Sequence, residues 1–500
     1  MLQLFMAISP ILIVMIGIVG LKKPATIVSA IALIYTIFVT MFYGKFKLEN
    51  AVLFSETTKG IIEGAKMVFM IWSAFLILNM LINTGAMDKI KEIIANLTLD
   101  KRKQFIIIAF CFGGFLEGVA GAGTPAAIAA PFLVALGIPP VFAIVGALVF
   151  NGIAASLGAA GLTTIGGFAA FLDVVDVMDI SKYTSFIHFF GALLAPILVL
   201  VILWGKKALD KGIVKFALAT GFAYGFFMVL VATFVGAEFP TICAGLGSLI
   251  VAIAYIKLFC KNESIPEEYQ YVIDESKGKS TMPAWKALSA YAILLVALPA
   301  VRFFAPLWFI KLGFAVWIGI TITCVCLVSS IILRDVTSMP GYMKTSFCSV
   351  FGALIAMASL VALSNLMKTS GMLSVIATVI ATVIANLLGP VYPAIAVIIG
   401  SLGSFVAGTT TGSNILFAPM HYEACTILGF NIPLVFAAQS AGGALGNMIC
   451  TNNVVAVCAT VGFKGEEGTI MRKVFKPICI LWLLYCLLAL FYAYVLFPAA

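Results

Sequence analysis

The stretch "GGFLEGVAGAGTP" at residues 113–125 decides the fold, because it places a charge and a helix break inside a long apolar run. Glu117 is the only charged residue between Phe105 and Leu172. An ionised carboxylate at the bilayer centre costs about 2.5–3.5 kcal/mol, so such residues usually face a cavity and often handle protons or ions. The sequence therefore favours a proton-coupling role for Glu117. A glutamate that only caps a re-entrant segment is the alternative.

The glycines after this glutamate predict the break itself. Three glycines make a helix implausible over residues 118–123. Thr124 followed by Pro125 is a good N-cap and first-turn pair for a new helix. Amide groups and the positive dipole end at such a helix start suit a carboxylate. The expected substrate-binding residues here are Gly121, Gly123 and Thr124; a packing break of small residues is the alternative.

Composition predicts an all-α polytopic membrane protein. The chain has 500 residues, of which 63% are hydrophobic and 10% charged, whereas soluble domains carry about 25% charged residues. Apolar segments long enough to cross a bilayer recur along the chain, and we expect about 12–14 transmembrane helices in the cell inner membrane. The sequence contains no soluble catalytic domain, metal-ligand spacing or nucleotide loop. We therefore expect no enzyme activity, no cofactor and no metal.

Two regions of the chain resemble each other. "GIPPVFAIVGALVFNG" (137–152) and "NIPLVFAAQSAGGALGN" (431–447) share the pattern I-P-x-V-F-A, and "GGFLEGVAGAGTP" aligns with "LGSFVAGTTTGSN" (402–414). Basic residues are dense after the apolar segment 65–85 and sparse after its counterpart 346–366. Because basic loops stay cytoplasmic, the two copies are expected to enter the membrane from opposite sides, as inverted repeats with broken or re-entrant helices.

This repeat divides the chain into seven expected parts, with both termini outside the cell. They are N-terminal helices (1–58), a first transport repeat with broken helices (59–172), further helices (173–259), a cytoplasmic loop (260–286), further helices (287–343), a second transport repeat with broken helices (344–463), and a basic loop with a last helix (464–500).

The second copy carries neutral polar residues where the first carries Glu117. The expected substrate-binding rim is Thr409, Thr410, Thr411, Ser413 and Asn414, with Ser413 or Asn414 capping the next helix. Threonines that only bond their own helix carbonyls are the alternative. Buried amides can ligate a substrate or bridge helices, which adds the candidates Asn151, Asn447, Asn452 and Asn453.

Three ionisable residues are weaker candidates. His421 and Glu423 could form a second proton relay, although a place at the membrane surface is favoured. Arg302 could clamp a carboxylate, but an arginine that snorkels from the end of a helix is the commoner case.

Residues 113–137 and the segment "QSAGGALGNMICTNNVVAVCATVGFKGEEGTIMRKVFKP" (439–477) resemble the signature and C-terminal segment of the bacterial L-lactate permease family. The resemblance implies a proton-coupled symporter for L-lactate and related 2-hydroxy monocarboxylates such as glycolate. It also implies that Glu117, Gly121, Gly123, Thr124, Asn447 and residues 409–414 occupy the transport region. Asn452 stands where many members have a histidine.

We therefore expect transport by alternating access. A small hydroxycarboxylate would bind between the two helix breaks, and protonation of Glu117 would remove a buried charge and permit the loaded carrier to turn. The expected partners are L-lactate or glycolate, the proton and the lipid bilayer; a homodimer is left open, and no nucleic acid is expected. The alternatives are a sodium-coupled carrier of another small organic anion and, less favoured, an anion channel.

Overall fold

The computed structural model describes residues 2–21, 23–121, 123–260, 264–271, 281–372, 374–376 and 389–498. Every regular element over these residues is a helix, which confirms the predicted all-α class. Within the described residues, nine helices are long and apolar enough to cross a membrane, or ten if one bent pair counts as a single span. Four shorter apolar helices accompany them. This inventory agrees with the predicted polytopic membrane protein.

The first half of the chain contains helices α1 to α12, and α6 and α7 flank the first break at residues 121–123. The bounds are α1 Leu2–Met15, α2 Ala25–Phe42, α3 Asn50–Asn83, α4 Ala86–Leu97, α5 Lys101–Phe105, α6 Gly113–Ala120, α7 Thr124–Ala135, α8 Pro140–Ala154, α9 Leu162–Ile165, α10 Val177–Trp204, α11 Lys211–Phe234 and α12 Pro240–Phe259.

The second half contains a comparable series of helices. The bounds are α13 Ala284–Phe304, α14 Leu307–Ile310, α15 Phe314–Leu333, α16 Met339–Thr369, α18 Tyr392–Ala407, α19 Thr410–Leu428, α20 Ile432–Asn447, α21 Thr451–Thr460 and α22 Glu467–Phe491. Both matched I-P-x-V-F-A segments begin corresponding helices, α8 and α20, close to their prolines. A long helix precedes each break, α3 in the first half and α16 in the second.

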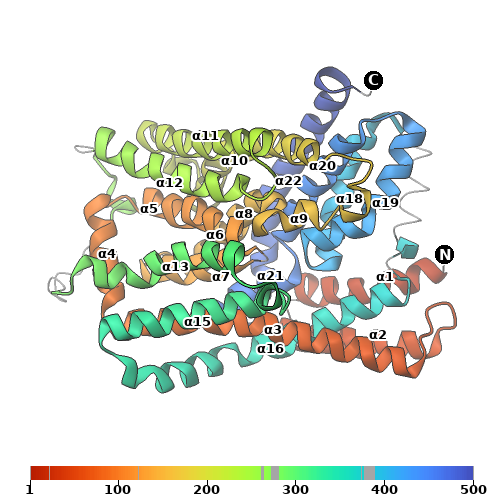
Figure 1. Ribbon diagram of the computed structural model, residues 1–500, viewed down its shortest axis with the longest axis horizontal. Coiled ribbons are helices and arrows are strands. Elements are labelled where there is room, and N and C mark those ends of the chain that lie inside the picture. The colour runs from red at the N-terminus through yellow and green to blue at the C-terminus, as the bar shows by residue number, and fades with distance from the viewer. Residues whose placement is uncertain are drawn as a thin grey trace.

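Helices α3 and α16 pack against each other and run in opposite directions. Along α3 and α16, the Trp72 indole donates to the Met343 carbonyl at 3.2 Å, whereas Gly60 lies against Ala362 near the other end of both helices. A Cβ on Gly60 would lie 2.3 Å from the Ala362 Cα atom, so the two backbones touch, as small residues permit between membrane helices. Figure 1 shows the long α3 and α16 side by side along one edge of the molecule.

A buried helical column positions the first break. The elements α5, a π-helical segment (Ile106–Phe112) and α6 follow one another without a gap, and residues 102–118 are all buried. The column packs against α12 and α7, and Figure 1 shows it between α12 and α13 in the middle of the bundle. Glu117 is therefore carried into the protein interior on an element that is surrounded by other helices.

Three loops meet at one end of the bundle. The Arg102 guanidinium donates to the Ala208 carbonyl and to the Asp210 carboxylate, each at 2.7 Å, and it lies 4.4 Å from the centre of the Tyr269 ring. Burial alone would raise the pKa of the Asp210 carboxyl, but hydrogen bonds from the Ile213 amide and Arg102, together with the charge of Arg102, hold that pKa below its usual value. Of the loop expected at 260–286, residues 261–263 and 272–280 lie outside the described residues.

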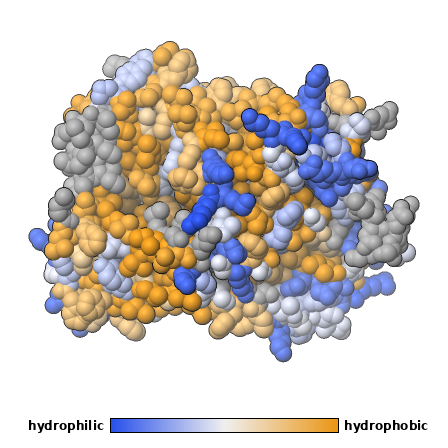
Figure 2. All heavy atoms as spheres, turned by 180° about the vertical axis from the view of Figure 1, so that it is seen from behind, coloured by the Kyte–Doolittle hydropathy of each residue, from blue (hydrophilic) through white to orange (hydrophobic). Residues whose placement is uncertain are grey.

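The outer surface suits a lipid environment. Figure 2 shows broad hydrophobic areas over the helices of one face, with hydrophilic residues gathered in a few patches. Large apolar side chains such as Phe38, Phe54, Ile250 and Phe304 are strongly exposed. In water this much apolar surface would be unfavourable, so its exposure fits a protein whose sides contact acyl chains.

Candidate functional site: three helix breaks that meet

The first break is shorter than predicted. Helix α6 continues through Gly118 to Ala120, so the expected interruption from 118 is wrong at its start. Close packing explains the difference, because a Cβ on Gly118 would lie 2.5 Å from the Ile242 nitrogen of α12. The chain turns at Gly121 (φ 68°) and Gly123 (φ 79°), a backbone conformation that favours glycine. Gly123, rather than Thr124, is the N-cap of α7.

Glu117 lies directly beside this break. Its side chain is 2% exposed, and its carboxylate accepts a hydrogen bond from the Gly123 amide at the start of α7. Its other oxygen, Oε2, has no hydrogen-bond partner. The Tyr224 hydroxyl, which lies against α6 at Gly114, is also without a partner. The start of α7 therefore serves the protein's own carboxylate, and two unsatisfied oxygens lie along α6.

The second break lies between α18 and α19. Gly408 (φ 75°) ends α18, and Thr409 caps α19 by accepting a hydrogen bond from the Gly412 amide at 2.9 Å. The expectation that Ser413 or Asn414 caps this helix is therefore wrong. Both are fully buried one turn further along: the Ser413 hydroxyl donates to the Gly400 carbonyl at 2.9 Å, and the Asn414 amide donates to the Thr163 carbonyl at 3.2 Å.

The remaining rim threonines differ in their surroundings. Thr410 is buried and its hydroxyl oxygen has no partner, whereas Thr411 is only partly buried. Ser404 of α18 and the Oδ1 atom of Asn414 are also buried without a hydrogen-bond partner. Three unsatisfied oxygens therefore lie on the helices that flank the second break.

A third break, between α20 and α21, touches both of the others. The two helices are bent by 42° at residues 448–450. A Cβ on Gly123 would lie 2.8 Å from Asn453 Oδ1, and one on Gly408 would lie 2.5 Å from Asn452 Nδ2. Asn453 is held by a hydrogen bond from its side-chain amide to the Asn447 carbonyl at 3.0 Å. Consecutive asparagines at the start of α21 thus join the two glycine breaks.

Helix α8 reaches the same region from the first half of the chain. A Cβ on Gly152 would lie 2.3 Å from the side chain of Met448 in the third break. The neighbouring Asn151 is buried, and its Oδ1 atom has no hydrogen-bond partner. The structure thus brings the end of α8 to the site predicted from sequence and leaves the Asn151 carbonyl oxygen unsatisfied.

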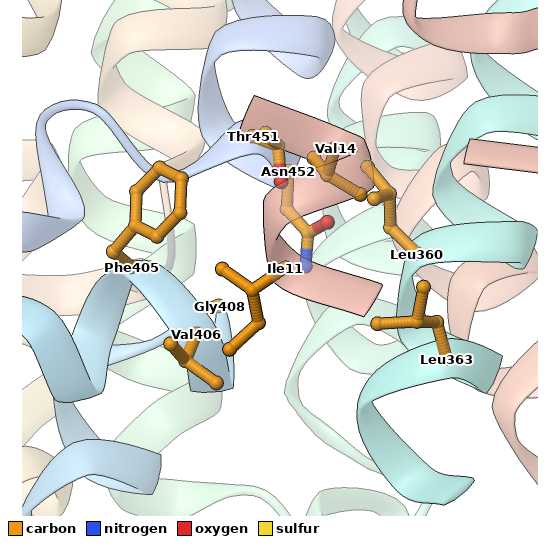
Figure 3. A pocket seen from close by; sticks show the side chains of 9 residues that line it. All are labelled: Ile11, Val14, Leu360, Leu363, Phe405, Val406, Gly408, Thr451 and Asn452. Atoms are coloured by element: carbon orange, nitrogen blue, oxygen red, sulfur yellow. The ribbon is translucent and has the colours of Figure 1, made fainter. Parts of the chain in front are cut away.

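A small pocket of about 30 Å³ opens at the second and third breaks. Gly408, Thr451 and Asn452 provide its polar part, and Figure 3 shows Asn452 pointing toward the middle of the pocket. Its apolar wall comes from α1, α16 and α18, through Ile11, Val14, Leu360, Leu363, Phe405 and Val406. This combination of a mostly apolar lining with a few polar groups is typical of small-molecule sites.

The weaker candidates lie elsewhere. His421 is fully buried, so its favoured place at the membrane surface is wrong; Glu423, two residues on, is exposed as expected. Arg302 lies near the end of α13, and its side chain is outside the described part of the structure. Thr124 begins α7, but its side chain is likewise not described.

Sequence reasoning missed several residues of this site. Thr451 lines the pocket, Tyr224 lies along α6, and Gly158 packs on Glu117. His188 is buried in the apolar run "SFIHFFGA" and bonds to Ser156. A histidine inside an apolar run was a usable signal for this cluster, whereas nothing in the sequence points to Gly158. Among the described residues, no group of three His, Cys, Asp or Glu side chains could hold a metal ion.

Comparison with known proteins identifies the family. The sequence model of the L-lactate permease family matches residues 3–307 and 296–496.

The chain belongs to the L-lactate permease family. It is 30% identical to the L-lactate permease of Streptococcus iniae over 466 residues, which cover 88% of this chain and 94% of that protein. It is 25% identical to the L-lactate permease of Escherichia coli over 537 residues, covering 97% and 95% of the two chains.

This member of the L-lactate permease family is accordingly a multi-pass protein of the cell inner membrane. Among solved structures, MtrF of Neisseria gonorrhoeae, described as an antimetabolite efflux pump, aligns over 95% of this chain and 96% of its own with a TM-score of 0.40 and 12% identity. That level of similarity carries no argument about fold or function here.

Proposed function

We propose that the protein is a proton-coupled symporter that carries L-lactate and related small 2-hydroxy monocarboxylates, such as glycolate, by alternating access. Its relatives are L-lactate permeases. A carrier of this kind needs a site for a small anion and a group that can take up a proton. The pocket at Asn452 and the buried Glu117 are the two candidates for these roles.

The lining of the pocket suits a small hydroxycarboxylate, which the carrier would admit by widening the pocket. Its polar part comes from Gly408 and from Thr451 and Asn452 in the first turn of α21, a helix that begins without a side-chain cap. The partial positive charge at a helix start favours a carboxylate, and the Thr451 hydroxyl and Asn452 amide can hydrogen-bond a substrate hydroxyl. The leucines of α16 provide an apolar surface for a methyl group. Asn447, Asn151 and the 409–414 rim, which lie outside the pocket lining on elements beside the three breaks, are secondary candidates.

The observation that carries the proposal is the contact chain between proton site and pocket. Glu117 accepts the Gly123 amide, Gly123 touches Asn453, and Asn453 adjoins Asn452 in the pocket. A hydrogen bond to an ionised carboxylate is roughly twice as strong as one to a neutral group. Protonation of Glu117 would therefore weaken its hold on the start of α7, and Gly123 would transmit that change to the asparagines of α21.

Inverted repeats are part of the same proposal. The opposite directions of α3 and α16 support it, and so do those of α10 and α22, where Tyr183 near the start of α10 contacts Phe497 just beyond α22. Carriers built in this way keep one central site and rock one part against another to expose it to each side in turn. We place the basic loops at Arg102 and Asp210 on the cytoplasmic side.

A sodium-coupled carrier is the second candidate, and one observation favours it. Ser404, Thr410 and Asn414 present buried oxygens without hydrogen-bond partners beside the second break. Hydroxyl and amide oxygens are the ligands that hard cations such as Na⁺ prefer. Under this candidate the ion would bind at these oxygens, and Glu117 would not take part in coupling.

Uptake into proteoliposomes separates the candidates. Lactate accumulation driven by a pH gradient, in the absence of sodium, is the expected result. Accumulation that requires a sodium gradient, with no response to pH, would favour the second candidate. Counterflow of preloaded lactate, tested against a panel of two- to four-carbon acids, would establish carrier behaviour and rank the substrates; its absence would contradict both candidates and favour a channel.

A further inference from the structure

The chain has two histidines, and both are fully buried in the helical bundle. His188 lies on α10 and His421 on α19. Each accepts or donates on both ring nitrogens, and each has a tyrosine hydroxyl 2.9 Å from Nδ1, Tyr485 for His188 and Tyr392 for His421. The two histidines are thus chemically matched, and the difference between them lies in what their Nε2 atoms contact.

The neighbours of His188 fix its tautomer. The Ser156 hydroxyl donates to the Ser440 carbonyl at 2.8 Å, so its oxygen must accept from His188 Nε2, which lies 2.8 Å away. His188 is therefore the neutral Nε2–H form, and Tyr485 donates to Nδ1. The chain of bonds runs from α22 through His188 to Ser156 and ends on α20.

His421 is arranged by the same logic. The Gln439 side-chain amide donates to Ser413 at 2.9 Å, so the Gln439 Oε1 atom faces His421 Nε2 at 2.9 Å and accepts from it. This histidine is also the neutral Nε2–H form, and Tyr392 donates to its Nδ1. All the groups in this second chain belong to α18, α19 and α20.

Only the His188 chain reaches the segment that packs on Glu117. Ser156 lies two residues before Gly158, where a Cβ would come within 3.0 Å of both Cγ and Oε1 of Glu117. Five residues further on, at Thr163 of α9, the chain is again tied to the second half, because the Asn414 amide donates to the Thr163 carbonyl. His188 therefore anchors the backbone that forms one wall around Glu117, and His421 does not.

We propose that His188 is a positioning residue for proton coupling. Through Ser156 it holds residues 156–158 against Glu117, as a neutral imidazole that carries no transported proton itself. His421 performs the same structural task within the second repeat and has no part in coupling. The inference rests on the proposed function, because it presupposes that Glu117 binds the coupled proton.

The matched histidines make a direct experiment available. His188→Leu and His421→Leu are compared in proteoliposomes in two modes: net lactate uptake driven by a pH gradient, and counterflow of preloaded lactate. Counterflow needs only the loaded carrier to turn, whereas net uptake also needs Glu117 to bind and release its proton in each cycle. His188→Leu is expected to lower net uptake by about tenfold relative to counterflow, the effect of one lost buried hydrogen bond. His421→Leu is expected to change both modes by the same factor.

Two further variants keep the test independent of folding. His188→Gln keeps an amide N–H that can donate to Ser156 and should recover most of the net uptake. Ser156→Ala removes only the hydroxyl oxygen that bonds to His188, and it should lower net uptake relative to counterflow as His188→Leu does. The inference is overturned if both histidine variants change the ratio of the two modes equally, or if His188→Leu and Ser156→Ala leave that ratio at its wild-type value. Absence of lactate counterflow in the wild-type protein would instead overturn the proposed function.

Discussion

Replacing Gly123 with alanine tests the contact that joins the proton site to the pocket. The added methyl group would lie 2.8 Å from Asn453 Oδ1, closer than real Cβ contacts, at a residue with φ of 79°. The left-handed backbone alone costs a non-glycine residue about 1–2 kcal/mol. Asn453 must also move, which breaks its hydrogen bond to the Asn447 carbonyl; an unsatisfied buried partner costs about 1–3 kcal/mol.

Gly137→Ala is the matched control. Gly137 has a φ of 84°, but nothing lies within 4 Å of its Cβ position, so this variant has the backbone cost without the clash. Gly123→Ala should therefore lose about 1–3 kcal/mol more than Gly137→Ala in thermal unfolding in detergent. Lactate counterflow should fall about tenfold or more in Gly123→Ala and stay near the wild-type rate in Gly137→Ala.

A double-mutant cycle isolates the contact. Asn453→Ala removes the atom that Gly123→Ala would strike, so the combined variant should lose less than the sum of the two single losses. Equal behaviour of Gly123→Ala and Gly137→Ala, or strict additivity in the cycle, would refute the reasoning, since the break at 121–123 would then not bear on α21.

Three further predictions concern coupling, binding and the loop end. A pH gradient of one unit can drive about tenfold accumulation of lactate when one proton is coupled. Glu117→Gln should abolish this accumulation while counterflow persists, and Glu423→Gln, at an exposed site, is the control. Tenfold accumulation by Glu117→Gln would contradict the assignment. Asn452→Ala should raise the KM for lactate counterflow about tenfold by removing one hydrogen bond in the pocket, and an unchanged KM would place the substrate elsewhere. Because the folded pKa of Asp210 is lowered, its stabilisation is present above the usual value of about 4 and is lost as the pH falls through the lower folded value. Its side chain is 41% exposed, so Asp210→Asn should cost no more than about 1 kcal/mol at pH 7, and that cost should shrink progressively as the pH falls below about 4. A cost that stays constant down to the acid limit of the folded state would show that the carboxylate charge is not responsible.

The sequence predicts those features of the fold that depend on neighbouring residues alone. Glycines with Pro125 predict the first break, and both segments that share the I-P-x-V-F-A pattern begin helices, α8 and α20. The start of the first break was misplaced because the packing of Gly118 on α12 stabilises a helical turn that propensity alone disfavours. The cap of α19 was misplaced by one turn for a different reason, since three threonines in a row leave the capping residue open.

The site was harder to predict, because its decisive contacts join distant parts of the chain. No local pattern relates Gly123 to Asn453 or Gly408 to Asn452. His421 was misplaced because Glu423, two residues on, suggested a polar surface. Successive residues of a helix are about 100° apart, so positions two apart point in nearly opposite directions, and His421 is buried while Glu423 is exposed.

The pairing of α3 with α16 constrains how the protein is assembled. Trp72 and Met343, which bond across the two helices, are 271 residues apart in the chain. During synthesis, α3 and Gly123 are therefore made long before their partners in the second half, α16 and Asn453. Irregular backbone at membrane depth needs protein or water around it, so the turn at 121–123 needs retained water until α21 arrives to pack on it.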